Sequence, residues 1–408
     1  MSSSSADTKL VGLYVHVPFC ARACPYCDFH FRVEARPAVR PLLAALEAEL
    51  HARGEVWQAR RFDTVYIGGG TPSALGPAGL HALVAWCKHS VDLAATAEIS
   101  VELNPEHVDP AMAGELASAE GGVAVVGGPD AMAGELASAG VDRVTLGVQS
   151  FSEVGLRTLG RAHRSAAASR AIDQLLRSGI QVGVDLIVGW PRQRDDELDL
   201  DVRTVVASGV SHVSVYALTL DEGVAWHKLV RRGARSYPDA DRQADLLLRA
   251  ESQLVQSGFE HYELSNYARG RARSRHNEKY WTGQDYLGLG PSAASARHDA
   301  RGGVWRETNP QGVAAWLADA ASRPPTAEHV TGEAAAAEAL WLGLRRLEGV
   351  ALPGFLARHP GLEADWVRRR LARQAARGNV RWEPAFERVS LAAGRWQWHD
   401  EVGLDLVS

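Results

Sequence analysis

The sequence predicts an α/β fold, a partial TIM-like (β/α)6 barrel followed by a small C-terminal domain. Short apolar runs rich in β-branched residues alternate with amphipathic stretches, as in parallel βα units that form an open sheet or a barrel. Six such units favour a partial barrel over a complete one of eight strands. The predicted strands are Leu13–Val17, Thr64–Ile67, Ile99–Leu103, Arg143–Val148, Val182–Val188 and His212–Leu218. Predicted helices between them include Ala38–Ala52, Gly79–Lys88, Ser165–Ser178 and Asp239–Gln256.

Length predicts the second domain. At 408 residues the chain exceeds the size at which a single hydrophobic core usually stops growing. Near residue 330 the sequence becomes an Ala-rich helical tract, "GEAAAAEALWLGLRRL", and the later stretches "NVRWEP" and "GRWQWHD" resemble short strands. We therefore expect a flexible N-terminus at 1–10, the barrel and its extension at 11–325, and a C-terminal domain of helices with a β wing at 326–408.

A tandem repeat interrupts the barrel region. The nine residues "AMAGELASA" at Ala111–Ala119 recur unchanged at Ala131–Ala139. One copy followed by "GVDRV" suffices as a helix before the fourth predicted strand. The surplus, 120–139, contains "EGGVAVVGGPD", whose glycines and proline favour an extruded loop. Two copies are too few for a solenoid. We expect one copy in the barrel helix and the other outside the barrel wall.

Composition excludes several classes of function. The net charge is −5 without a basic stripe, which argues against nucleic acid as a main partner. Met1–Leu10 is polar and lacks the basic and apolar regions of a signal peptide, and no apolar run approaches the length of a membrane span. Three of the four cysteines lie within eight residues, which is no disulfide framework. A cytoplasmic, reducing location is expected.

The cysteine cluster is the strongest chemical signal. Cys20, Cys24 and Cys27 place three thiolates within reach of one iron–sulfur cluster and leave one iron of a four-iron cluster open to a small molecule. The alternative is a zinc site completed by a nearby side chain. Candidates for that fourth zinc ligand are His16, Asp28 and His30. Cys87 lies in an apolar helical stretch and is predicted to be a buried structural thiol.

Polar residues recur at the ends of the predicted strands. The glycine turn "YIGGGTP" follows the second strand, where bare backbone can approach a ligand. Glu102 and Gln149 end the next two strands, and Asp185 lies on the fifth. Each signal alone is consistent with a simple turn or a helix cap. Together they predict an active site at the carboxyl ends of the strands, as in other βα barrels.

These motifs resemble the radical S-adenosylmethionine (SAM) superfamily, whose cysteine motif carries an aromatic residue before its last cysteine and is followed by GGGTP. "YVHVPFC", "YIGGGTP", "VELNP", "LGVQSF" and "DLIVGWP" are similar to the branch that holds oxygen-independent coproporphyrinogen oxidase and the heme chaperone HemW. The likeness runs from about residue 12 to about residue 310 and implies a barrel of the radical SAM type. It implies a [4Fe-4S] cluster on the three cysteines, with SAM bound through its amino and carboxylate groups to the open iron. The matching SAM-site positions are Tyr14, Tyr26, Gly70, Thr71, Pro72, Glu102, Gln149, Arg161, Asp185 and Ala217.

Two further features distinguish the members of this branch. The decarboxylating oxidases place a fourth cysteine two residues after the third, whereas the HemW proteins have Phe there, as this chain does at Phe29. "HNEKYW" fits the HNxxYW motif of the HemW proteins and implies His276 as a heme iron ligand. Without the resemblance, this stretch would be interpreted as a packed aromatic turn. One departure is Ala294, which stands after "YLGLGP" where the branch usually has His.

The resemblance implies a heme chaperone that binds the cluster, SAM and heme and passes heme to an acceptor protein. The alternative is an oxygen-independent coproporphyrinogen III dehydrogenase, in which a SAM-derived radical starts an oxidative decarboxylation. A third possibility is a radical SAM enzyme with another substrate, so whether the chain is an enzyme stays open here. The implied partners are heme and a heme-acceptor protein, with peripheral membrane association and a homodimer as open alternatives.

Overall fold

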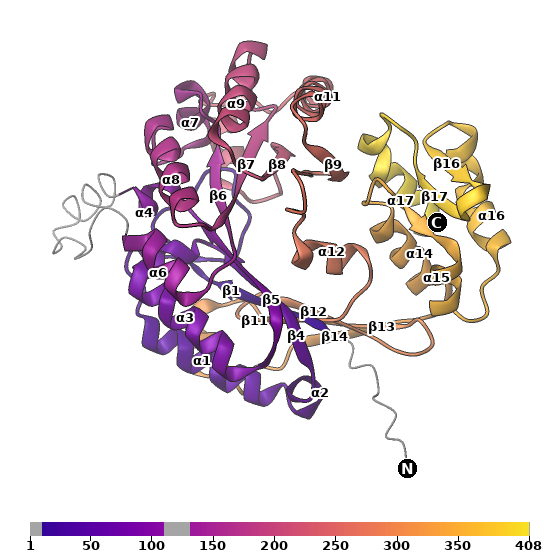
Figure 1. The fold of residues 1–408 in the computed structure, drawn as a ribbon, viewed down its shortest axis with the longest axis horizontal. Helices are drawn as coiled ribbons and strands as arrows, with labels where there is room; N and C mark the ends of the chain where they lie inside the picture. The colour runs from indigo at the N-terminus through magenta and orange to yellow at the C-terminus, as the bar shows by residue number, and fades with distance from the viewer. Residues whose placement is uncertain (1–9, 110–130, 408) are drawn as a thin grey trace.

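A curved sheet of parallel strands forms the centre of the computed structural model, which describes residues 10–109 and 131–407 (Figure 1). Six strands pair in parallel in the order β1-β4-β5-β6-β7-β8. They are β1 (Val11–Val17), β4 (Arg61–Gly69), β5 (Asp92–Leu103), β6 (Arg143–Gln149), β7 (Gln181–Val188) and β8 (His212–Ala217). Five predicted strands lie inside these bounds, and the sixth extends one residue beyond β8. The predicted partial barrel is confirmed.

Helices cover the outer side of these strands, where Figure 1 shows α1, α3, α6, α8 and α9. The spacing of apolar residues explains this arrangement: in α8, Ala168, Ala171, Ile172 and Leu175 recur at helical intervals and are fully buried. The helices of the barrel region are α1 (Val39–Ala52), α2 (Glu55–Gln58), α3 (Gly76–Ser90), α4 (Pro105–Val108), α6 (Ala131–Ala139), α7 (Glu153–Leu159), α8 (Ser165–Arg177), α9 (Asp195–Ser208), α10 (Ala225–Arg231) and α11 (Ala240–Gln256). In the described ranges, no helix combines the length and the apolarity needed to cross a membrane.

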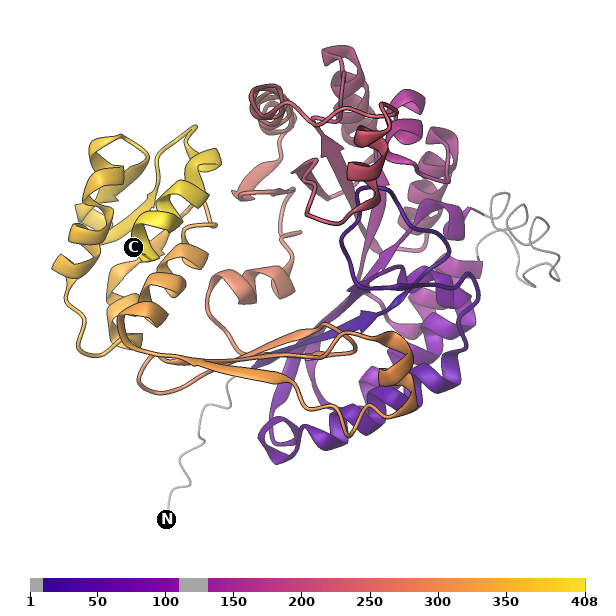
Figure 2. The ribbon, with the colours of Figure 1, turned by 180° about the vertical axis from the view of Figure 1, so that it is seen from behind.

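The sheet continues beyond both ends of the parallel set and reaches twelve strands. On the far side of β1, β11 pairs in parallel, and β12, β13 and β14 follow antiparallel. Figure 2 shows these long strands running from the barrel toward the C-terminal helices. The added elements are β9 (Glu260–Glu263), β10 (Asn266–Ala268), α12 (Arg275–Trp281), β11 (Tyr286–Leu289), β12 (Ala294–His298), β13 (Val304–Thr308), α13 (Val313–Ala318) and β14 (Thr326–Val330).

A second hydrophobic core lies in the C-terminal region. Leu340, Phe355, Val367 and Val389 are among its buried side chains. Helices surround a three-stranded antiparallel wing of order β15-β17-β16. The elements are α14 (Gly332–Gly343), β15 (Val350–Ala351), α15 (Leu352–Arg358), α16 (Ala364–Ala376), β16 (Val380–Glu383), the 3-10 turn Pro384–Phe386, β17 (Arg388–Leu391) and α17 (His399–Val407). The predicted boundary at 326 falls at the start of β14, which belongs to the large sheet.

One predicted strand of this region is wrong. The stretch "GRWQWHD" forms a 3-10 turn at Trp396–Trp398 and then the start of α17. Gly394 turns the chain away from β17 with a φ of 69°, and the indole of Trp396 is buried. Its Nε1 donates a 2.8 Å hydrogen bond to the Glu251 carboxylate. The alternating aromatic residues resemble a strand pattern, but Trp396 anchors the C-terminal unit to α11.

The second copy of the repeat forms α6, directly before β6. Its residues Met132, Ala133, Leu136 and Ala139 are buried in the barrel core, and α6 packs against α3. The first copy, Ala111–Ala119, lies outside the described residues. The part of the expected loop that precedes α6, residues 120–130, lies outside them as well.

Deleting Glu120–Ala139 should leave the barrel folded. The deletion removes the copy that forms α6, but the identical copy at Ala111–Ala119 then precedes "GVDRV" and can take the same place. We expect an unchanged yield of folded protein and a thermal midpoint close to that of the full chain, since changes of connection length carry little closure cost. Circular dichroism melts of both chains measure this. A largely insoluble deletion variant would show that the intervening residues are needed for folding.

Candidate functional site

A cavity of about 430 Å³ opens at the carboxyl ends of the parallel strands. We call it the first cavity. It is lined by the cysteine loop after β1, the glycine turn after β4 and the last residues of β5 to β8, which is where βα barrels place their active sites. The structure brings the following predicted site residues to its walls: Cys20, Cys24, Cys27, Tyr26, Gly70, Thr71, Pro72, Glu102, Gln149, Arg161, Asp185 and Ala217.

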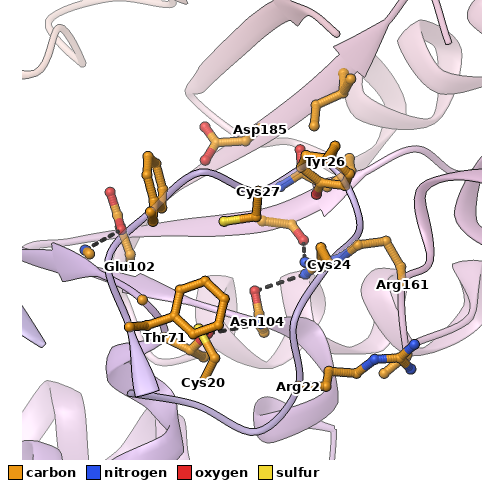
Figure 3. A pocket seen from close by; sticks show the side chains of 18 of the residues that line it. Cys20, Arg22, Cys24, Tyr26, Cys27, Thr71, Glu102, Asn104, Arg161 and Asp185 are labelled. Atoms are coloured by element: carbon orange, nitrogen blue, oxygen red, sulfur yellow. Dashed lines mark hydrogen bonds between the residues drawn. The ribbon is translucent and has the colours of Figure 1, made fainter. Parts of the chain in front are cut away.

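The three thiols are presented by a loop that the backbone closes on itself. The short strands β2 (Phe19–Cys20) and β3 (Arg32–Val33) pair with each other and hold the two ends of this loop together. Figure 3 shows the three cysteines directed into the cavity. The Thr71 hydroxyl donates to Cys20 Sγ at 3.2 Å, and Arg161 Nη1 donates to Cys24 Sγ at 3.4 Å. Donors on two sides of the loop therefore face the sulfur atoms.

Burial controls the protonation of these thiols. It raises the pKa of Cys20 to about 12 and the pKa of Cys27 to about 11. Cys20 and Cys27 therefore keep their protons at neutral pH, and a metal that displaces those protons can bind them as thiolates. Cys87 is fully buried in α3, away from the cavity, as predicted for a structural thiol.

The zinc alternative loses one of its ligand candidates. His16 is buried, and both of its ring nitrogens have partners: Nδ1 lies 3.0 Å from the Tyr14 hydroxyl and Nε2 lies 2.9 Å from the His30 carbonyl oxygen. A zinc site needs its ligand atoms within about 2.3 Å of one point. In residues 10–109 and 131–407, no group of three or more His, Cys, Asp or Glu side chains converges in this way.

The glycine turn after β4 packs directly against the cysteine loop. A Cβ atom at Gly70 would lie 2.6 Å from the Phe19 carbonyl oxygen and 3.1 Å from Cys20 Sγ, so only glycine fits there. Gly70 also donates a 2.9 Å backbone hydrogen bond to Val17. The preceding Gly69 has a φ of 108° and donates its N–H to the Glu102 carboxylate at 3.1 Å. The turn thus fixes the cysteine loop and an acidic side chain together.

Several polar atoms of the first cavity are buried without a hydrogen-bond partner in the described chain. They are Gln149 Oε1, Arg161 Nε and Asp185 Oδ1. Burying such atoms costs free energy unless a ligand binds them. Gln149 also adopts a left-handed backbone with a φ of 71°, a strain that is typical of functional sites. The donors and acceptors fit a polar ligand such as SAM.

Two carboxylates of the cavity, Glu102 and Asp185, are held differently. Burial raises the pKa of Glu102, but its carboxylate accepts a 2.7 Å hydrogen bond from the Tyr66 hydroxyl, which opposes that shift. Burial raises the pKa of Asp185 to about 7. A hydroxyl-rich or cationic ligand would offset the cost of ionising both groups.

Sequence reasoning missed Asn104 and Tyr66. Asn104 ends the quoted "VELNP" motif and accepts a 2.8 Å hydrogen bond from Arg161 Nη2, as the dashed line in Figure 3 shows. The same nitrogen donates to the Gly147 carbonyl oxygen at 2.8 Å. Tyr66 stands at the start of "YIGGGTP" and orients Glu102. Both residues belong to the quoted motifs "VELNP" and "YIGGGTP". Their position in these motifs, close to Glu102 and to the glycine turn, is the sequence feature that could have identified them as site residues.

Tyr14 and His276 are not among the residues that line the first cavity, so the roles predicted for them toward SAM and heme stay predictions. Tyr14 instead borders a second cavity. His276 is fully buried: its Nδ1 lies 2.8 Å from Thr64 Oγ1 and its Nε2 lies 2.8 Å from the Tyr280 hydroxyl. Burial lowers the pKa of His276 to about 3, so its ring is neutral. Neither ring nitrogen is open to a heme iron in this structure.

Replacing Cys20, Cys24 or Cys27 singly by Ala should abolish iron–sulfur absorbance after anaerobic reconstitution. Unmodified protein should carry about four irons per chain. Cys87→Ala is the matched control, because it removes a buried thiol outside the first cavity and should leave the absorbance intact. Iron and acid-labile sulfide analysis measures the content. Stoichiometric zinc without iron or sulfide would contradict this assignment.

Asp185→Asn should stabilise the SAM-free protein at alkaline pH. Because the pKa of Asp185 rises from 3.8 to about 7 on folding, the ionised carboxylate destabilises the fold. This destabilisation is absent below about pH 4 and complete above about pH 7. At pH 8 the variant should therefore melt at a higher temperature than the unmodified protein, by on the order of 2 °C for each kcal/mol of destabilisation that the substitution removes. Near pH 4 the two proteins should melt at the same temperature. Thermal melts at both values test this, and a variant that melts lower at pH 8 would refute it.

Comparison with known proteins places this site in a family. Residues 14–205 match the radical SAM superfamily. The heme chaperone HemW of Mycobacterium tuberculosis is 35% identical over 345 residues, covering 84% of this chain and 83% of that protein. The heme chaperone HemW of Synechocystis sp. is 31% identical over 378 residues, covering 90% and 85%. The solved structure of Escherichia coli coproporphyrinogen III oxidase (HemN), a radical SAM enzyme, matches this chain with a TM-score of 0.78. The match covers 98% of this chain and 90% of that one at 19% sequence identity, so it shows a likeness of fold alone. The chain therefore belongs to the HemW family of the radical SAM superfamily.

Proposed function

We propose that this protein is a heme chaperone that binds a [4Fe-4S] cluster and SAM in the first cavity, binds heme elsewhere, and passes heme to an acceptor protein. Membership in the radical SAM superfamily implies the cluster and SAM. The relatives that share about a third of their residues with most of this chain are heme chaperones by name, which supports the heme assignment. A coproporphyrinogen III dehydrogenase is the second candidate, supported by the likeness of fold to HemN.

The first cavity has the residues that the two resident groups require. Cys20, Cys24 and Cys27 would hold three irons of the cluster, which supplies one-electron redox chemistry and an open coordination position. Asp185 and Glu102 would accept hydrogen bonds from SAM hydroxyl or ammonium groups. Arg161 Nη1 places a positive charge 3.4 Å from the Cys24 sulfur.

Phe29 is the observation that separates the chaperone from the dehydrogenase. Its side chain is 59% exposed and lines the first cavity, two positions beyond the last cysteine. The decarboxylating oxidases have a cysteine at this position, and a phenyl ring can neither bind a metal nor transfer a proton. A chaperone needs no such group, because its task is to hold finished heme and release it.

The proposed setting is the cytoplasm. All four cysteines are free thiols, and free thiols persist where the environment is reducing. Heme and a heme-acceptor protein are the proposed partners. Neither a membrane surface nor a second copy of the chain is required by this function.

Purified, cluster-loaded protein should bind heme at about one per chain and should not convert coproporphyrinogen III. Heme titration followed by Soret absorbance measures the first property. Anaerobic incubation of coproporphyrinogen III with the protein, SAM and a reductant, followed by chromatography of the porphyrins, measures the second. A bona fide coproporphyrinogen dehydrogenase assayed in parallel is the positive control. Catalytic formation of protoporphyrinogen IX would favour the second candidate.

A further inference from the structure

A second cavity, of about 700 Å³, lies between the barrel extension and the C-terminal unit. Its walls come from α12, β12 and β13 on one side and from α14 and the end of α15 on the other. Figure 1 shows α12 beside α14, and the two helices are in contact. The volume is within the range of small-molecule sites, about 300–1,000 Å³. The wall combines aromatic side chains and small apolar residues, which suit a large flat ligand, with the charged residues Asp299, Arg306, Glu307, Glu338 and Arg358.

The cavity contains a histidine in the arrangement of a metal ligand. His298, at the end of β12, lines the cavity, and its Nδ1 lies 3.0 Å from the carboxylate of Asp285. Asp285 is 5% exposed and also accepts the backbone N–H of His298 at 2.8 Å. A carboxylate behind Nδ1 places the ring proton there and leaves the Nε2 lone pair free for iron.

Nε2 of His298 lies beside Gly283, which has no side chain to cover it. A Cβ atom at Gly283, which lines the cavity, would lie 3.6 Å from it, and no hydrogen bond to it occurs in the described chain. Ala294 and Ala296 precede His298 on the same face of β12 and also line the cavity, so small side chains leave room beside the imidazole. His359 lines the wall that follows α15. Burial lowers its pKa to about 4, so it adds no charge at neutral pH.

An arginine stands at the rim without an acidic partner. Arg358 lines the cavity and is exposed. Its Nη1 donates to the Thr282 carbonyl oxygen at 2.6 Å, and no ion pair joins it to a carboxylate in residues 10–109 and 131–407. A Cβ atom at Gly283 would lie 3.7 Å from the same Nη1, so the guanidinium and Nε2 of His298 face one glycine. Arginine binds carboxylates well, and Arg306 of the same cavity already pairs with Glu338.

The aromatic part of the "HNEKYW" motif lines this cavity, whereas its histidine does not. Tyr280 and Trp281 are wall residues. Tyr280 packs edge-on against Tyr286, with ring centroids 4.6 Å apart. His276 lies behind Tyr280 and binds its hydroxyl. His276 is thus a positioning residue for the aromatic wall.

We propose that the second cavity is the heme site, with His298 Nε2 as the iron ligand and Arg358 as the partner of a heme propionate. This inference rests on the proposed function, and it names the site and ligand that the function requires. A flat, apolar dianion with a central iron matches a cavity that offers an aromatic wall, a free imidazole nitrogen and an unpaired guanidinium.

Two probes separate the roles of these side chains: heme, and iron-free protoporphyrin IX, which has the propionates but no iron. His298→Ala in the full-length, cluster-loaded protein should weaken heme binding by at least about tenfold and shift the Soret band, while leaving protoporphyrin IX affinity unchanged. Arg358→Ala should weaken the binding of both probes and keep the Soret position. His276→Ala should lower heme affinity without loss of the nitrogen-ligated spectrum.

His81→Ala is the matched control, because His81 also pairs with a carboxylate, Glu135 at 2.8 Å, but lies outside both cavities. Its binding of both probes should equal that of the unmodified protein. His298→Gln, whose amide can still donate to Asp285, repeats the test if His298→Ala lowers the thermal midpoint.

The outcomes distinguish this inference from the proposed function. Heme binding that is unchanged in affinity and spectrum by both His298 variants would overturn the site while leaving the chaperone function intact. A nitrogen-ligated spectrum that is lost in His276→Ala but kept in His298→Ala would likewise overturn it. Absence of heme binding by the unmodified protein would overturn both.

Discussion

The position of one guanidinium determines how the first cavity is assembled. Arg161 reaches three separate segments: Cys24 in the cysteine loop, Asn104 after β5 and Gly147 on β6. Burial alone would lower its pKa, but Tyr26, Glu106 and the Cys24 sulfur outweigh this and keep the group charged. A positive charge drawn away from water requires such partners. Arg161 therefore ties the cysteine loop to the strand ends that also carry the acidic residues.

A chain of side-chain contacts joins the two cavities through the sheet. Glu102 in the first cavity accepts the Tyr66 hydroxyl, and the Tyr66 ring stacks on His276 with centroids 5.3 Å apart. His276 in turn binds the Tyr280 hydroxyl, and Tyr280 lines the second cavity. Since His276 is neutral and fully buried, it can serve both neighbours without the cost of a buried charge. The motif histidine thus contacts side chains that belong to both cavities.

The sequence predicted the parts of the molecule that follow from periodicity and local motifs. Six parallel strands and the residues at their ends were recoverable because buried parallel strands are continuous apolar runs and their polar ends meet at one edge. The extension from β11 to β14 could not be predicted from the sequence, because short antiparallel strands such as Thr326–Val330 are largely exposed and lack an apolar pattern. Neither could spacing reveal that Tyr14 faces the second cavity, since that depends on how β11 and α12 pack against β1. His298 was missed because its partner Asp285 lies on a different segment.

The charges of the two cavities give each a different ligand. Glu102, Asp185 and, at the mouth, Asp28 and Asp221 line the first cavity. Their carboxylates suit the sulfonium and ammonium groups of SAM and would repel the two propionates of heme. In the second cavity Glu338 pairs with Arg306, Glu307 with Arg53 and Asp299 with His329. This leaves Arg358 as the lining arginine without an acidic partner in the described residues. Under the proposed function, a porphyrin dianion is therefore disfavoured where the acids gather and favoured beside Arg358, which would keep the proposed cargo apart from the proposed cluster. The Tyr66–His276–Tyr280 contacts hold the two cavities a few side chains from each other.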